Sequence, residues 1–206
     1  MNYSLGEVES LCKKAARGAG YSWGLAEDAG RAVRWLESRG LAGLAALADL
    51  LETLGTDLSD HRPAEGWSAP APLCAIQTGA ALSDHAFLLS HDAPIQLGET
   101  LHPMLLIPFL AGRRQVDLTW GAARLSVSEN GIHITGALGP VLAAKAGKVD
   151  IVLSNKPRIA ALTPRSRALI RPEIYARLNR FAHKTYAPAT EASRLAGAGA
   201  GLSDND

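Results

Sequence analysis

The chain has 206 residues and a formal net charge of +1, with 47% hydrophobic and 20% charged residues. This length suits one ordinary domain or a small helical unit beside a β-rich one, and the composition excludes a disordered or fibrous chain. The sequence contains no apolar run of the length that spans a bilayer and no signal-like amino terminus, so we expect a soluble protein of the cytoplasm.

The first third of the chain carries three helical patterns. Ser4 and Glu7 are spaced as a capping box, and apolar residues then recur at helical spacing to about residue 18. A second helix is expected from about residue 23 to residue 39, with Ser22 as N-cap and Gly40 as C-cap. A leucine stripe between residues 41 and 54 predicts a third helix. Residues 1–56 therefore form a predicted helical array.

Residues 57–72 are polar and rich in proline, which is typical of a linker. After them the pattern changes to short apolar runs of strand length, so residues 73–187 are interpreted as a β-rich domain with a terminal helix. The expected strands lie at residues 73–76, 86–89, 104–107, 116–120 and 149–153.

The clearest local pattern is a β-hairpin around Asn130 and Gly131, two residues that tolerate the positive φ angles of a tight turn. A two-residue loop would pair Val127 with Ile134 and give the hairpin one apolar and one polar face. Residues 138–147 can form a short helix between strands. Pro172 is expected to begin the closing helix, and the residues from 188 to 206 form a predicted disordered tail.

The predicted fold class is therefore α+β. It combines a helical amino-terminal array, a mostly antiparallel sheet with the Asn-Gly hairpin, and a closing carboxy-terminal helix.

Positive charge is concentrated late in the chain. Residues 145–184 contain ten Lys and Arg against two acidic residues, whereas residues 1–144 contain ten basic and fifteen acidic residues. Internal pairing or plain solvation explains such a segment most simply, small-anion binding comes next, and nucleic acid is disfavoured because few aromatic residues interleave with the charges. The anion-binding candidates are Lys156, Arg158, Arg165 and Arg167, which follow a predicted strand at loop-like positions.

A second group of candidates is polar. Asp84, His85, His91, Asp92 and His102 flank or follow the expected strand at residues 86–89. Two His and two Asp can supply metal ligands or an acid and base pair, although the ends of an extended strand are about 20 Å apart. The plainer interpretation is that these residues cap turns.

The sequence lacks the motifs of several other kinds of functional site. Cys12 and Cys74 belong to no zinc or redox pattern, and residues 142–149 do not fit a phosphate-binding loop. No nucleophile elbow is present. We therefore predict no metal site, leave the cofactor unknown, and leave open whether the protein is an enzyme.

Residues 4–9, 14–20 and 24–30, with the sequences SLGEVE, KAARGAG and GLAEDAG, resemble a bacterial family of about 200 residues that is catalogued only as a domain of unknown function. That resemblance implies no activity. Residues 39–41, 97–103 and 116–118 are more weakly similar to parts of the malate and L-lactate dehydrogenases that lack a Rossmann fold. That family has Ser-His-Gly after the Arg-Gly turn, where residues 42–44 are Ala-Gly-Leu, so the resemblance implies a reduced, non-catalytic relative.

The leading functional hypothesis is a non-catalytic protein that binds a small anionic ligand or a partner protein, with self-association as a further option. The alternative is a small-metabolite enzyme, either a divergent NAD(P)-dependent oxidoreductase or a metal-assisted enzyme that uses the polar candidates between residues 84 and 102. The sequence points to no membrane partner.

Overall fold

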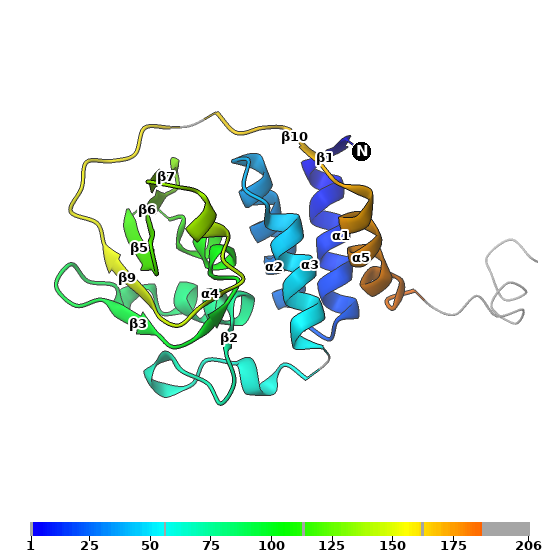
Figure 1. Ribbon diagram of the computed structural model, residues 1–206, viewed down its shortest axis with the longest axis horizontal. Helices are drawn as coiled ribbons and strands as arrows, with labels where there is room; N and C mark the ends of the chain where they lie inside the picture. Colours follow the sequence, from blue (N-terminus) through cyan, green and yellow to red (C-terminus); the bar gives the residue numbers. More distant parts are fainter. Residues whose placement is uncertain (1, 56, 113, 162, 187–206) are drawn as a thin grey trace, which may run out of the picture.

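A computed structural model describes residues 2–55, 57–112, 114–161 and 163–186 of the chain. The fold is α+β, and its helices are α1 (Leu5–Gly18), α2 (Trp23–Ser38), α3 (Gly43–Leu54), α4 (Ala75–Asp84) and α5 (Pro172–His183). Figure 1 shows α1, α2, α3 and α5 on one side of the molecule and the largest sheet on the other. The tail predicted to be disordered lies outside the described residues.

The strands make one large and two small sheets. They are β1 (Asn2–Ser4), β2 (Leu73–Cys74), β3 (Ile95–Leu97), β4 (Thr100–Leu101), β5 (Val116–Trp120), β6 (Ala123–Ser128), β7 (Gly131–Thr135), β8 (Lys145–Ala146), β9 (Val149–Leu153) and β10 (Arg167–Leu169). The five-stranded sheet is antiparallel throughout, with the order β3-β9-β5-β6-β7. A three-stranded sheet has the order β2-β4-β8, and β1 pairs with β10 in a two-stranded sheet.

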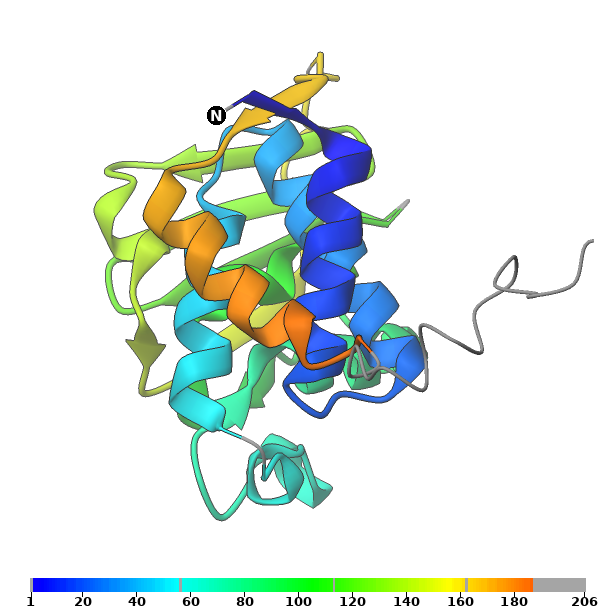
Figure 2. The same ribbon diagram turned by 90° about the vertical axis from the view of Figure 1, so that its right-hand side faces the viewer.

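The helical side is built as its sequence predicts. The Ser4 hydroxyl accepts a hydrogen bond from the backbone N–H of Glu7, and the Glu7 carboxylate accepts one from the backbone N–H of Ser4, which completes the capping box. Ser22 caps α2 in the expected way. Figure 2 faces this side and shows α5 beside α1 and α3, with which it is in contact. The last helix of the chain therefore packs on the first and third.

The predicted hairpin forms between β6 and β7, but its register differs. Val127 pairs with Ile132 rather than with Ile134, and Ser128 pairs with Gly131. Gly131 begins the second strand at a φ of 150°, so the turn lies one residue earlier than expected. Because the shift in pairing is two residues, each side chain stays on the face that the alternation predicts.

Two short apolar runs were predicted wrongly as strands, and a third prediction is right only in part. Residues 86–88 form the 3₁₀ helix η3 (Ala86–Leu88), and residues 104–107 lie in the 3₁₀ helix η4 (Pro103–Leu110). Only residues 73 and 74 of the first run are extended, because α4 begins at Ala75. A short apolar run does not distinguish a strand from a buried helical segment by periodicity alone.

Residues 138–147 form the expected short helix only in part. They contain the 3₁₀ helix η5 (Gly139–Leu142) followed by β8. Two further 3₁₀ turns, η1 (Ser59–His61) and η2 (Glu65–Trp67), occupy the stretch interpreted as a linker.

The hydrophobic core is continuous between the helical side and the sheet. The segment η4 contacts α2, α3 and α4 on one side and β6 on the other. Leu105, Leu106 and Ile107 of this segment are fully buried. Among the described residues, no helix is long and apolar enough to cross a membrane.

Candidate functional site

The predicted group of His and Asp residues is divided among separate parts of the fold. Asp84 and His85 lie at the end of α4, where the ring nitrogen Nδ1 of His85 is 2.8 Å from the carbonyl oxygen of Ala81. The His85 ring also lies beside the rings of Trp67 and Phe87. These contacts tie His85 to the end of its own helix and to the η2 turn.

The other three members lie elsewhere. The ring nitrogen Nδ1 of His91 is 3.2 Å from the carbonyl oxygen of Leu153 in β9, and Asp92 is exposed in the same loop as His91. His102 is buried, its backbone N–H donates to the carbonyl oxygen of Ala144 at 2.8 Å, and burial lowers the pKa of its ring. In the part of the chain that the structure describes, no three His, Cys, Asp or Glu side chains are grouped to hold a metal ion.

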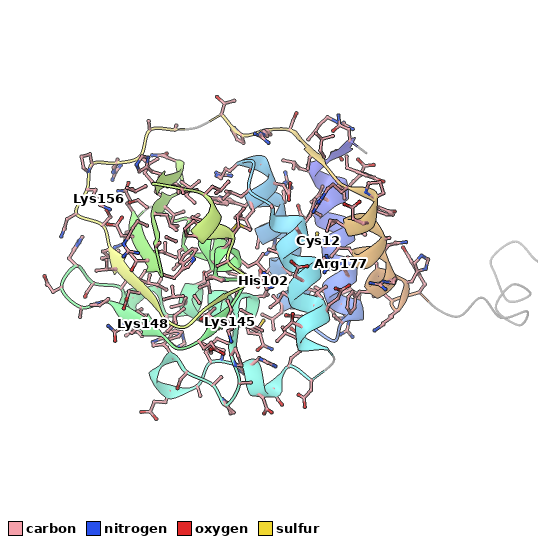
Figure 3. The ribbon with its side chains drawn as sticks, viewed as in Figure 1. Cys12, His102, Lys145, Lys148, Lys156 and Arg177 are labelled. Carbon is pink, nitrogen blue, oxygen red and sulfur yellow. The ribbon has the colours of Figure 1, made fainter. Side chains whose placement is uncertain are left out.

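Much of the positive charge between residues 145 and 184 is paired with carboxylates of the same chain. The salt bridges that join the basic segment to earlier acidic residues are Lys145–Glu99, Lys156–Asp117, Arg177–Asp49, Arg177–Glu52 and Arg180–Glu52. Figure 3 shows Lys145, Lys148 and Lys156 on the sheet side and Arg177 on the helical side. The basic segment is therefore spread over the molecule rather than gathered into one patch.

Two of the four anion-binding candidates, Arg165 and Arg167, line one surface cavity of about 470 Å³. The cavity lies where the turn between α2 and α3 meets β10 and the beginning of α5. Its charged lining residues are Glu37, Arg165, Arg167 and Arg171. Three arginines and one glutamate thus line the cavity, so its charged lining residues carry a net positive charge.

Arg165 is placed by the backbone around it. Its N–H donates to the carbonyl oxygen of Ser38 at 2.7 Å, and its guanidinium lies against Gly40. A Cβ atom at position 40 would approach the guanidinium carbon to 2.8 Å, and Gly40 has a φ of +75° that favours glycine. Among the described residues, the Arg165 guanidinium donates no hydrogen bond, so its donors can serve a ligand.

Arg167 and Arg171 are partly engaged. The Arg167 guanidinium donates to the side-chain oxygen of Asn2 at 3.1 Å and to its carbonyl oxygen at 2.8 Å. The Arg171 guanidinium lies 3.4 Å from the Glu173 carboxylate in an exposed pair. An exposed pair of this kind contributes little to stability and can open toward a competing anion.

Glu37 has a structural role in this cavity. Its carboxylate accepts a hydrogen bond of 2.9 Å from the backbone N–H of Leu44, in the first turn of α3. Burial raises the pKa of Glu37, while the N–H groups of Leu44 and Gly43 and the charge of Arg165 act in the opposite direction. Because Glu37 occupies the amino end of α3, an anion in the cavity would have to bind through the arginines.

The other two candidates line a different hollow of about 450 Å³ on the polar face of the large sheet. Lys156 lies 3.2 Å from the Asp117 carboxylate, which also accepts a hydrogen bond from the Ser126 hydroxyl. Gln115 holds the segment around Arg158 through hydrogen bonds with Pro157 and Ile159. Lys156 is therefore neutralised in part, whereas Arg158 has no ion pair among the described residues.

Sequence reasoning missed Glu37, Gly40 and Arg171 as neighbours of the two arginines. Arg171 was present in the count of basic residues, and Gly40 was expected only as a helix cap. Nothing local signals that residues 40 and 165 meet, because that contact depends on how the chain returns from the sheet to the helical side.

The fold and these contacts define an α+β protein with an arginine-lined surface cavity. Residues 3–85 match the family described as Protein of unknown function (DUF3726). No curated protein and no solved structure matches the chain, so the resemblance to the malate and L-lactate dehydrogenases has no support. The family match covers α1 to α4 and does not reach Arg165.

Proposed function

We propose that this protein binds a small organic anion, a carboxylate or phosphate ester, in the cavity lined by Arg165, Arg167 and Arg171. The observation that carries the proposal is the Arg165 guanidinium, which is held against Gly40 and donates no hydrogen bond within the described residues. The planar guanidinium fork matches the oxygens of a carboxylate or phosphate in a two-point contact.

The size of the cavity supports a small ligand. Its volume of about 470 Å³ lies within the range of small-molecule sites. The apolar lining residues Leu41, Leu44 and Ile174 lie beside the arginines and can contact the carbon skeleton of a metabolite. These features favour an organic anion over a bare inorganic ion.

The alternative of a small-metabolite enzyme gains no comparable support. It would need the polar side chains between residues 84 and 102 to act together, and His85, His91 and His102 each contact a different part of the fold. We therefore propose binding and no reaction at these residues.

Titration calorimetry with citrate and with inorganic phosphate at low ionic strength tests the proposal. Replacing Arg165 by Gln removes charge-assisted hydrogen bonds of about 1.5–3 kcal/mol each, so citrate should bind about tenfold to a hundredfold more weakly. Arg167→Gln should weaken binding less, because that side chain already donates to Asn2.

Arg158→Gln is the matched control, since it removes an exposed arginine from the hollow on the sheet. Citrate should bind to this variant as it does to the parent protein. Equal affinity for the parent and Arg165→Gln, or a selective loss in Arg158→Gln, would contradict the assignment of the cavity.

A further inference from the structure

A second cavity, of about 540 Å³, lies on the opposite end of α2 from the arginine cavity. Its walls are the beginning of α2, residues 62 and 63 after η1, and the exposed side of α4. Its polar lining residues are Ser22, Arg62, Gln77, Asp84 and His85. Leu25, Ala80 and Ala81 add an apolar wall.

Gln77 lines this cavity, and its side chain carries an unsatisfied acceptor. Its side-chain oxygen Oε1 is buried and accepts no hydrogen bond from any described residue. Buried polar atoms in native proteins almost always have a partner, so an orphaned acceptor beside a cavity indicates a missing donor. Because Oε1 has almost no accessible surface, the Gln77 amide would turn toward the cavity to accept a hydrogen bond from an N–H or O–H group of a ligand.

Two unpaired charges of opposite sign line the same cavity. In the described part of the chain, the side chains of Arg62 and Asp84 take part in no hydrogen bond or ion pair, and they come from different elements. The nearby Asp28 carboxylate, by contrast, pairs with Arg31 at 3.3 Å, so Asp84 is the carboxylate left for a ligand. The end of α4 is therefore a favourable place for a positive group.

We propose that this cavity binds a small zwitterion, an α-amino acid or a dipeptide. The ammonium group would donate to Gln77 Oε1 and lie near the Asp84 carboxylate, and the ligand carboxylate would pair with the Arg62 guanidinium. Leu25 and the two alanines leave space for a small side chain. This arrangement gives Asp84 and His85 a place in a binding site without a metal ion.

His85 closes one side of the cavity. Its ring packs edge-on against the Trp67 ring at a centroid distance of 6.0 Å, which links α4 to the η2 turn. The stretch from residue 57 to residue 72 thereby serves as a wall of the site as well as a connection.

The test is titration calorimetry of the full chain with L-alanine and with glycylglycine. N-acetylglycine, which lacks the ammonium group, and trimethylglycine, which lacks any N–H donor, are the control ligands. At least one of the two zwitterions should bind, and neither control ligand should. If neither zwitterion binds, or if the controls bind equally well, the proposal fails.

Two variants test the residues. Gln77→Leu removes the acceptor and Arg62→Gln removes the charge, so each should weaken binding of the zwitterion about tenfold or more. Gln96→Leu, on the exposed face of β3, and Arg158→Gln are matched controls that should bind as the parent does. Should Gln77→Leu fail to fold, Arg62→Gln decides the question, because Arg62 is exposed. Unchanged affinity in Arg62→Gln would overturn the assignment.

The zwitterion cavity and the anion cavity are separate sites with different ligands. Citrate and phosphate have no ammonium group, and Arg165→Gln should leave binding of the zwitterion unchanged. A failure at one cavity is therefore distinguishable from a failure at the other.

Discussion

Gly18 sets the separation between α1 and α5. A Cβ atom at this position would lie 1.9 Å from the backbone carbonyl oxygen of Phe181, and backbone cannot move aside as a flexible side chain can. Gly18→Ala should therefore destabilise the protein by about 1–3 kcal/mol, the usual range for overpacking, although alanine is the better helix former. Urea unfolding measures the difference.

Gly6 provides the control within the same helix. A Cβ atom at position 6 would meet nothing within 4 Å. Gly6→Ala should leave the free energy of unfolding unchanged or raise it by less than about 1 kcal/mol. Equal destabilisation by the two substitutions would show that the close approach of α1 and α5 does not control stability.

At the scale of elements, a network of salt bridges joins α5 to α3. The Arg177 guanidinium contacts the carboxylates of Asp49 and Glu52, the latter at 2.6 Å. Arg180 contacts Glu52 as well, but its side chain is 71% exposed against 25% for Arg177. Because exposed pairs contribute little, Arg177 should carry most of the stabilisation.

Arg177→Met should lower the free energy of unfolding by about 1–2 kcal/mol, whereas Arg180→Met should change it by less than about 0.5 kcal/mol.

The pH dependence of this network gives a further test. Hydrogen bonding to Arg177 lowers the pKa of Glu52 below its ordinary value of 4.5. A carboxylate whose pKa is lowered by folding stabilises the fold at pH values above its ordinary pKa. This stabilisation is lost as the pH falls through the pKa that the group has in the folded state. The difference between parent and Arg177→Met should therefore shrink in acid, and a difference independent of pH would refute this account.

The elements differ in how far the sequence predicts them. The helices α1, α2 and α5 follow from capping residues and apolar spacing, because those signals are local. The 3₁₀ segment η4 does not, since its eight residues are all apolar, six of them are buried, and no polar face marks a period. Of the arginine cavity, the sequence predicted only Arg165 and Arg167. The contact between Arg165 and Gly40 depends on tertiary packing, which the spacing of residues along the chain does not reveal.

At the scale of the whole molecule, the two ends of the described chain pack against each other. Residues 1–56 were expected as a helical array that a linker joins to a β-rich domain at residues 73–187. In the structure β10 pairs with β1, and α5 packs on α1 and α3, so the end of the described chain completes the helical side (Figure 2). The segment η4 joins the cores of both sides. We infer that the two parts unfold together.

A variant with Trp120 as its only tryptophan tests this inference. Trp120 is buried in β5 and donates its indole N–H to the carbonyl oxygen of Pro140, so its fluorescence reports the sheet. Phenylalanine replaces Trp23, Trp35 and Trp67 in this variant. Far-ultraviolet circular dichroism of the same sample reports chiefly the helices. Because the two sides share one core, the two unfolding curves in urea should superimpose. A fluorescence transition separated from the helical one would instead divide the protein into two domains near residues 57–72.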